Sequence, residues 1–286
     1  MQGKPRIRFT VNTASVHVTG LMNDGLHSVC QSARCPNRAE CWANGTATFM
    51  ILGEFCTRAC RFCAVKTMLK PPAPDPEEPK KLADAVARLG LMYAVITSVT
   101  RDDLADYGAG HFAECVRELK KANPKLVVET LIPDFNCDRS AMMTLVEAKP
   151  DVISHNIETV ERLSGGIRDR RAGYRKSLDA LKLAEELSGG RIPIKSGIMV
   201  GLGESAEEVV GTMADLRDAG VSMITVGQYL RPGKDSRFMP VKEYVPVETF
   251  ARYERLGYEL GFAHVASGPL VRSSYKAAQA FQKAIF

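Results

Sequence analysis

Short apolar runs alternate with longer amphipathic segments from residue 47 to residue 260, and this alternation restricts the fold more than any other feature of the chain. The runs are rich in Val, Ile and Leu, as expected of parallel strands that are covered on both faces. The segments between them place apolar residues at a helical period. Strands are expected at Ala47–Gly53, Tyr93–Val99, Leu126–Ile132, Val152–Ile157, Ile192–Val200 and Met223–Leu230. Helices are expected at Glu77–Leu89, His111–Ala122, Arg139–Ala148, Tyr174–Ser188, Ser205–Ala219 and Val247–Leu260.

A repeat of strand and helix builds a parallel sheet that is covered by helices. About six such units are too few for a closed eight-stranded barrel, so the sequence predicts an α/β fold, a partial (β/α)6 TIM-like barrel with N- and C-terminal extensions. The length of 286 residues suits one domain of this kind. We expect the N-terminal extension at residues 1–46, the barrel at residues 47–262 and the C-terminal extension at residues 263–286. Ser205 and Glu208 have the spacing of a capping box at the start of one helix.

Six of the eight cysteines lie between residues 30 and 63, in two groups of three. The first triplet is Cys30, Cys35 and Cys41 (C-x4-C-x5-C), and the second triplet is Cys56, Cys60 and Cys63 (C-x3-C-x2-C). Residues 1–6 lack the apolar segment of a secretory signal, so we expect a cytoplasmic protein. Glutathione keeps thiols reduced in that compartment, where clustered cysteines are more often metal ligands than disulfides.

Charge and hydropathy argue against two classes of partner. The net charge of +5 is modest, and no run of Lys and Arg interleaves with aromatic residues, so we expect no nucleic acid. No apolar run is long enough to cross a bilayer, so we expect no membrane.

The second triplet follows the first expected strand of the barrel, Ala47–Gly53. Functional groups of parallel α/β folds lie at the carboxyl ends of the strands. Zinc usually takes four ligands, and no His or fourth Cys follows closely. Three thiolates instead suit a 4Fe-4S cluster in which the fourth iron is open to an exogenous ligand. A zinc loop with a distant fourth ligand is the alternative.

The first triplet is a second set of three thiolates, a few residues upstream. One metal centre cannot use six thiolates, so two centres are expected.

The sequence also resembles a known family. The C-x3-C-x2-C loop, with Phe62 before its last cysteine and a strand before it, resembles the radical S-adenosylmethionine superfamily. Both triplets together, and several blocks as far as residue 277, resemble the lipoyl synthase family within it. These blocks are VCQSARCPNRAECW (29–42), CTRACRFCAVK (56–66), TSVTRDDLADYGAGHF (97–112), SHNIETV (154–160), KSGIMVGLGE (195–204), VGQYLRP (226–232) and SGPLVRSSYKA (267–277).

The resemblance implies two 4Fe-4S clusters. The cluster on the second triplet would chelate S-adenosyl-L-methionine through its open iron, and one electron would cleave that cofactor to a 5′-deoxyadenosyl radical that abstracts hydrogen. The cluster on the first triplet would take a serine of the motif Arg272–Tyr275 as its fourth ligand, with Ser274 preferred over Ser273. A serine pair that caps the last helix is the alternative. This auxiliary cluster would give up its sulfurs to the substrate.

The implied reaction is sulfur insertion at C6 and C8 of a protein-bound octanoyl-lysine, which forms the lipoyl cofactor. The implied protein partners are octanoylated lipoyl-carrier domains, such as the glycine cleavage H protein and 2-oxoacid dehydrogenase E2. An electron donor such as ferredoxin or flavodoxin and a cluster-repair protein are also implied.

Four polar residues are candidates for binding the cofactor. Asn156 and Glu158 can bond a ribose, with a pair at the start of a helix as the alternative. Arg168 can meet the cofactor carboxylate, with a solvated surface arginine as the alternative. Lys195 lies in an apolar strand, where a charge needs a partner. We expect that partner to be a carboxylate of cofactor or substrate rather than an internal one.

Other residues near strand ends have plainer interpretations. Asp102 and Asp103 either orient the cofactor or substrate or cap the next element. Cys115 fits a buried free thiol in a helix, and His155 fits a core histidine with satisfied ring nitrogens. Trp42 follows Cys41 and is expected to shield the auxiliary cluster.

Two other functions fit parts of the sequence. A methylthiotransferase of the same superfamily also has two clusters, but its RNA-acting form usually carries a further basic domain, and the chain ends shortly after Tyr275. A zinc-stabilised binding protein would need no serine motif. The motif Arg272–Tyr275 therefore favours sulfur insertion over both.

Overall fold

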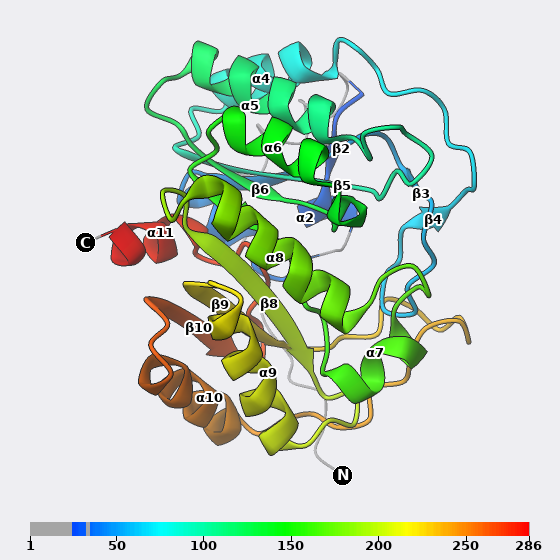
Figure 1. Cartoon of the computed structure of the whole chain (residues 1–286), viewed down its shortest axis with the longest axis vertical. Coiled ribbons are helices and arrows are strands. Elements are labelled where there is room, and N and C mark those ends of the chain that lie inside the picture. The colour runs from blue at the N-terminus through cyan, green and yellow to red at the C-terminus, as the bar shows by residue number, and fades with distance from the viewer. Residues whose placement is uncertain (1–24, 33–34, 286) are drawn as a thin grey trace.

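A computed structural model describes residues 25–32 and 35–285, so most of the predicted N-terminal extension lies outside the described residues (Figure 1). The described strands form one large sheet in the order β1-β2-β5-β6-β7-β8-β9-β10. Neighbours from β2 to β10 pair in parallel, whereas β1 pairs with β2 antiparallel. The strands are β1 His27–Ser28, β2 Thr46–Ile51, β5 Tyr93–Ser98, β6 Val127–Leu131, β7 Val152–Ser154, β8 Ile194–Val200, β9 Met223–Gln228 and β10 His264–Gly268. A separate parallel pair consists of β3 Phe55–Cys56 and β4 Lys66–Thr67.

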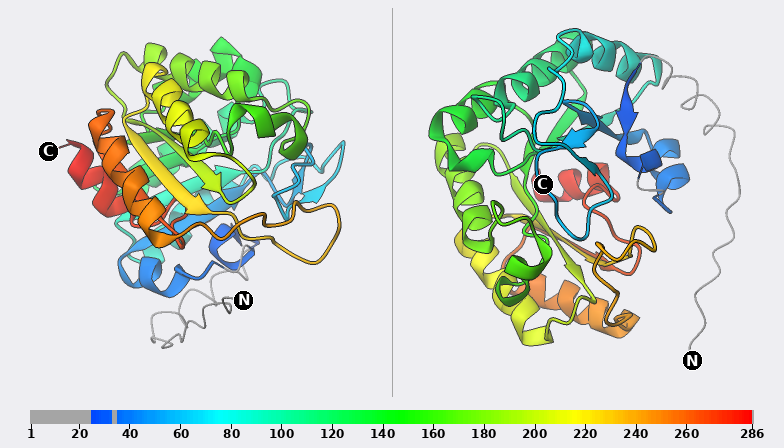
Figure 2. Two further views of the ribbon diagram at one scale, coloured as in Figure 1. Left: turned by 90° about the horizontal axis from the view of Figure 1, so that it is seen from below. Right: turned by 90° about the vertical axis from the view of Figure 1, so that its right-hand side faces the viewer.

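Helices follow the strands in turn and cover the outer face of the curved sheet, as the right-hand view of Figure 2 shows. This arrangement is the partial TIM-like barrel that the alternation of strand and helix predicts. The helices are α2 Val29–Ser32, α3 Arg38–Ala43, α4 Glu78–Arg88, α5 Ala109–Ala122, α6 Arg139–Glu147, α7 Glu161–Ile167, α8 Tyr174–Ser188, α9 Ala206–Asp218, α10 Val247–Glu259 and α11 Ala277–Ile285, with a 3₁₀ turn, η2, at Phe135–Cys137.

The barrel continues beyond the six expected parallel strands. β10 pairs with β9 along its whole length, from His264 with Met223 to Gly268 with Gly227. From the sequence, these residues were expected in the C-terminal extension, residues 263–286. The segment HVASG is short and mostly small or polar. Pairing with β9, rather than apolar content, makes it a strand.

Buried apolar side chains explain why the other strands form where the sequence predicts them. All six residues of β2 and all six of β9 are buried, so both faces of these strands are covered. The capping box at the start of α9 is confirmed, because the Ser205 hydroxyl accepts from the Glu208 N–H at 3.3 Å and the Glu208 carboxylate accepts from the Ser205 N–H at 2.7 Å. Both contacts satisfy amides that the first turn of a helix leaves unpaired.

Helix α11 lies inside the curve of the sheet rather than on its outer face (Figure 2). Its residues Ala277 and Phe281 pack on Tyr93 and Val95 at the amino end of β5. The rings of Tyr93 and Phe281 meet edge to face with centroids 6.2 Å apart. The last helix therefore closes the barrel at the amino ends of its strands, opposite the loops that carry functional groups.

Candidate active site

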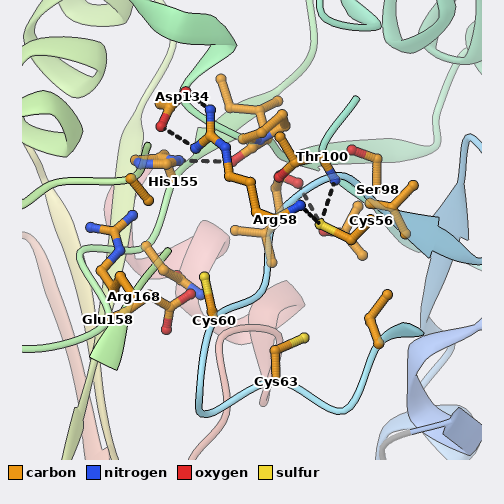
Figure 3. A pocket seen from close by; sticks show the side chains of 18 of the residues that line it. Cys56, Arg58, Cys60, Cys63, Ser98, Thr100, Asp134, His155, Glu158 and Arg168 are labelled. Carbon is orange, nitrogen blue, oxygen red and sulfur yellow. Dashed lines mark hydrogen bonds and ion pairs between the residues drawn. The ribbon is translucent and has the colours of Figure 1, made fainter. Parts of the chain in front are cut away.

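The second triplet begins at the last residue of β3, Cys56, and continues into the loop toward β4, beside the carboxyl ends of the barrel strands (Figure 3). All three of its cysteines line one cavity, which has a volume of about 190 Å³. The cysteines are free thiols. Close spacing in the sequence and placement beside the strand ends therefore bring the three sulfurs to one cavity, as the sequence predicts.

Backbone amides surround the sulfurs of this loop. Cys56 Sγ accepts from the N–H groups of Arg58 and Thr100, both at 3.4 Å. Cys60 Sγ accepts from the N–H group of Asp169 at 3.3 Å. Amides that point at cysteine sulfurs stabilise the negative charge of an iron–sulfur cluster. The donor set of the second triplet therefore fits such a group.

Burial makes the thiols of Cys60 and Cys63 hold their protons in the absence of a metal. It raises the pKa of Cys60, and it raises the pKa of Cys63 to about 12, against the opposing effect of backbone N–H groups. A thiol must lose its proton to bind metal, so loading this site releases protons.

Among the described residues, no group of three His, Cys, Asp or Glu side chains lies close enough to hold a single metal ion. A zinc ion draws every ligand atom to within about 2.3 Å of one point. A four-iron cluster spaces its ligands more widely, because each thiolate binds a different iron. The backbone amides that point at the sulfurs of Cys56 and Cys60 suit such a cluster.

Three of the four predicted cofactor-binding residues line the same cavity: Asn156, Glu158 and Arg168. Val160 occupies the N-cap of α7, so the interpretation of Asn156 and Glu158 as a helix-start pair is wrong. Arg168 is buried, so it is not a solvated surface arginine.

Two atoms of these residues are buried without a hydrogen-bond partner among the described residues, namely Asn156 Oδ1 and Arg168 Nε. Burial also raises the pKa of Glu158, although Arg168 and Asn156 oppose the shift. Buried polar groups normally have partners, so these residues have capacity left for a polar ligand in the cavity.

Lys195 does not face this cavity, and the expected contact with a cofactor or substrate carboxylate is wrong. Its ammonium group lies 2.9 and 3.0 Å from the two carboxylate oxygens of Glu129. The Tyr93 hydroxyl donates to the same carboxylate at 2.7 Å. Lys195 is near the amino end of β8 and Glu129 is on β6, with the short strand β7 between them. The structure instead shows the internal ion pair, which was the less favoured expectation from the sequence.

His155 lines the cavity as a satisfied core histidine, as predicted. Its Nδ1 lies 2.8 Å from the Ile132 carbonyl oxygen and its Nε2 lies 2.8 Å from Ser177 Oγ. Because a carbonyl oxygen only accepts, Nδ1 carries the proton and Ser177 donates to Nε2. Burial and the nearby Arg168 lower the pKa of His155 to about 4, so the ring is neutral at pH 7. Cys115 is fully buried as a free thiol, which is also as predicted.

Sequence reasoning missed a charged group inside the second triplet. The Arg58 side chain is buried and pairs with Asp102 and Asp134. Burial by itself would raise the pKa of Asp134. The hydrogen bonds and charge of the Arg58 guanidinium together have the larger effect and lower this pKa to about 2. Asp102 therefore positions Arg58 rather than capping a helix, and Asp103 pairs with Arg101 at 2.9 Å. The sequence signal that could have pointed to this group is an arginine between two cysteines that have the spacing of metal ligands.

The first triplet lies beside the C-terminal serine motif, although the two are far apart in the sequence. The Cys35 N–H donates to the Cys30 carbonyl at 3.1 Å, which brings these two residues together. Burial raises the pKa of Cys41 to about 11, against a hydrogen bond from the Lys276 backbone N–H. Burial also raises the pKa of Cys35, and the positive charge of Arg272 opposes that rise. Tertiary structure thus brings the motif to the thiols that the resemblance pairs with it.

Further contacts hold the C-terminal segment against α3. The Asn37 side chain donates to the Leu270 carbonyl at 2.6 Å. Glu40 accepts from the Tyr275 hydroxyl at 3.3 Å and lies 3.5 Å from the Lys276 ammonium group.

The two serines of the motif point to different partners. Ser273 Oγ accepts from Asn156 Nδ2 at 2.8 Å, and Ser274 Oγ accepts from Thr48 Oγ1 at 2.8 Å. Neither bond is made to an amide of α11, so these contacts do not support the interpretation of the serines as a helix cap. Because Asn156 lines the cavity, its bond to Ser273 links the site of the second triplet to the motif beside the first.

The sequence of this chain is similar to those of known proteins. The Radical SAM superfamily profile matches residues 50–216. The mitochondrial lipoyl synthase of Populus trichocarpa is 52% identical over 265 residues, which cover 91% of this chain and 68% of that protein. The apicoplast lipoyl synthase of Toxoplasma gondii is 54% identical over 258 residues, which cover 90% of this chain and 47% of that protein.

Solved structures share the fold at low sequence identity. The hydrogenase maturase HydG has a TM-score of 0.60 and 12% identity, with 94% of this chain and 69% of that chain covered. Methylornithine synthase has a TM-score of 0.52 and 15% identity, with 89% of this chain and 82% of that chain covered.

None of the described helices is both long and apolar enough to cross a membrane.

Proposed function

We propose, from the membership of this chain in the lipoyl synthase family of radical S-adenosylmethionine enzymes, that it inserts sulfur at C6 and C8 of an octanoyl chain bound to a carrier-protein lysine. The observation that carries this proposal is the bond between Asn156 and Ser273. It connects a cavity lined by three thiols to a serine motif that lies beside three further thiols.

Two groups of cavity residues would hold the cluster of the second triplet and its cofactor. Cys56, Cys60 and Cys63 would bind a 4Fe-4S cluster, which together with S-adenosyl-L-methionine supplies radical hydrogen abstraction when both are bound. Asn156, Glu158 and Arg168 would orient the cofactor through their unpaired or partly paired polar atoms. Lys195 has no part in this set, since Glu129 holds it.

The first triplet would hold the second 4Fe-4S cluster, with Ser274 or, failing that, Ser273 as the fourth ligand. A serine oxygen is a hard ligand for an iron that prefers thiolates, so it can leave readily. A cluster with one weak ligand suits a group that must give up sulfur.

The barrel would limit the access of water to this chemistry. α11 closes the amino end of the barrel, and Leu131, Ile132 and the neutral ring of His155 contribute apolar surface to the cavity. Exclusion of water limits side reactions of reactive intermediates.

We infer that octanoylated lipoyl-carrier domains are the substrates, with the glycine cleavage H protein and 2-oxoacid dehydrogenase E2 as the candidates. A ferredoxin or flavodoxin would supply electrons, and a repair protein would rebuild the spent cluster. The cytoplasmic location stays a prediction. The names of the two relatives given above place them in a mitochondrion and an apicoplast.

Metal analysis of the wild-type protein, together with assays of cofactor cleavage and lipoyl formation in three variants, tests the function. Wild-type protein prepared without oxygen should contain about eight irons with matching sulfide. Cys35→Ala should still cleave S-adenosyl-L-methionine but should form no lipoyl product, because only the sulfur donor is lost. Cys60→Ala should abolish cleavage. Cys137→Ala is the matched control, since Cys137 lies outside both triplets.

Two results would contradict the proposal. Full lipoyl output from Cys35→Ala would remove the first triplet from the role of sulfur donor. Zinc without sulfide in the wild-type protein would exclude radical chemistry altogether.

A further inference from the structure

Arg58 lies inside the second triplet, and two aspartates hold its guanidinium from two sides. Figure 3 shows its contact with one of them, Asp134. Asp134 accepts from Nη1 at 2.5 Å and from Nη2 at 2.8 Å. Asp102 accepts from Nε at 3.0 Å and from Nη2 at 2.7 Å. These bonds use four of the five N–H groups of the guanidinium, so its orientation is fixed and little capacity is left for a ligand. We call Arg58, Asp102 and Asp134 the Arg58 brace.

Each aspartate of the brace follows a different barrel strand. Asp102 comes after β5 and also accepts from Thr57 Oγ1 at 2.9 Å. Asp134 comes after β6, and its side chain is 0% exposed. The brace therefore ties the loop of the second triplet to two neighbouring strands of the rigid sheet.

The backbone directly after Asp134 adopts an unfavourable conformation. All three residues of Phe135–Cys137 have positive φ, between 41° and 56°. Consecutive left-handed residues other than glycine are disfavoured by contacts of the Cβ atom. Asn136 is held there by the Tyr107 hydroxyl at 3.2 Å and the Lys176 ammonium group at 2.7 Å. Strained turns of this kind persist where surrounding contacts determine them, often at functional sites.

The brace controls amides that point at sulfur. The Arg58 N–H bonds Cys56 Sγ, and the Asp169 N–H bonds Cys60 Sγ. Asp169 is in turn tied to the loop by the Ala59 N–H at 2.9 Å. If the Arg58 side chain were released, residues 57–60 would lose one of their anchors to the sheet, while the Thr57 N–H would keep its bond to the Thr100 carbonyl at 2.9 Å. We expect these N–H···S bonds to lengthen as a result. Hydrogen bonds to the sulfurs are among the factors that set the reduction potential of an iron–sulfur cluster.

We propose that Arg58, held by Asp102 and Asp134, is a positioning residue that sets the reduction potential of the cluster on the second triplet by keeping backbone N–H groups on Cys56 and Cys60. The inference rests on the proposed function only in that a cluster binds there. The alternative is that Arg58 acts simply as a positive charge near the cluster.

Redox titration of three variants separates these two mechanisms. The midpoint potential would be measured on the anaerobic holoenzyme by electron paramagnetic resonance, following the signal that responds to added S-adenosyl-L-methionine. Arg58→Lys keeps the charge but cannot make the paired hydrogen bonds by which the guanidinium holds both aspartates, which we call the fork. Arg58→Met removes the charge and the fork. Asp102→Asn keeps the shape of its side chain but removes a negative charge and weakens the fork.

The brace predicts a lower potential for all three variants, because each loosens the N–H···S bonds that favour the reduced cluster. We expect the ratio of reduced to oxidised cluster at a fixed potential to fall about tenfold, which equals about 59 mV for one electron. Arg170→Lys, at an exposed position of a neighbouring loop, is the matched control and should leave the potential unchanged. In cluster-free protein, hydrogen exchange of the amides of residues 57–60 should accelerate in Arg58→Lys but not in the control.

Two results would overturn the inference. One is a wild-type potential in Arg58→Lys. The other is opposite shifts, downward for Arg58→Met and upward for Asp102→Asn, which a simple charge effect predicts. Asp102 is 18% exposed, so Asp102→Asn provides a test even if a variant of buried Arg58 fails to fold. Absence of lipoyl product from the wild-type protein, with the potentials of the variants shifted as expected, would count against the proposed function and leave the brace standing.

Discussion

Replacing Lys195 by methionine tests the buried ion pair that the structure shows in place of the expected cofactor contact. The side chains of Lys195 and Glu129 are 3% and 0% exposed. In Lys195→Met, the Glu129 carboxylate keeps the Tyr93 hydroxyl at 2.7 Å but loses both bonds to the ammonium group. A buried carboxylate without a counter-ion is strongly unfavourable.

The magnitude follows from proton uptake. Protonating a carboxyl group that has an ordinary pKa of about 4.3 requires, at pH 7, about 2.7 times 1.4 kcal/mol, or about 4 kcal/mol. This value is the upper limit of the free-energy penalty, because the unpaired carboxylate can take up a proton instead of staying charged. Mutations that break buried pairs lower the free energy of unfolding by about 3–5 kcal/mol, in the same range. At pH 5 the same proton uptake requires only about 1 kcal/mol. A carboxyl protonated only in the folded state gives stability at low pH that is lost as the pH rises, so the deficit of Lys195→Met should shrink on acidification.

Urea unfolding at pH 7 and pH 5, followed by circular dichroism, measures this deficit. The double variant Lys195→Met/Glu129→Gln removes both charges and keeps an acceptor for Tyr93, so it should recover most of the loss. Lys125→Met, at an exposed position, is the control and should be neutral. A deficit below about 1 kcal/mol that does not change with pH would refute the reasoning. Weakened cofactor binding at full stability would instead restore the contact expected from the sequence.

Two further predictions concern His155 and Gly227. Because burial lowers the pKa of His155 to about 4, the unfolded chain binds a proton that the folded chain does not between about pH 6.5 and 4. The free energy of unfolding of cluster-free protein should therefore fall by up to about 3 kcal/mol over that range, and His155→Gln should remove this part of the slope; an unchanged slope would contradict it. A Cβ atom at Gly227 would lie 2.3 Å from the Val271 carbonyl oxygen, so Gly227→Ala should displace the serine motif and reproduce the result of Cys35→Ala, cofactor cleavage without lipoyl product. Gly211→Ala, where nothing lies within 4 Å, should keep both activities, and equal behaviour of the two variants would contradict the argument.

Features that depend only on residues close together in the chain could be predicted from the sequence. Periods of apolar residues identified the strands β2, β5, β6, β7, β8 and β9, because burial on both faces of a parallel strand leaves a local pattern. The capping box of Ser205 and Glu208 is equally local. The second triplet reaches one cavity because its three cysteines share one short loop at a strand end.

Features that depend on strand order and register could not be predicted in this way. The sequence shows that Lys195 needs a partner, but only the positions of β6 and β8 in the sheet show that Glu129 supplies it. Arg58 similarly meets Asp134 because Asp134 follows a strand that ends beside the loop of the second triplet. β10 carries too little apolar content to be recognised before its pairing with β9 is known.

The sequence by itself determined the fold class, the two sets of thiols and, through resemblance, the family. Spacing and periodicity are carried by neighbouring residues, and those features need nothing more. Only the tertiary structure decided which charges pair, and only it placed the motif Arg272–Tyr275 beside the first triplet and bonded Ser273 to Asn156. The physical reason is that a contact between distant residues depends on the path of all the chain between them, which no local pattern contains.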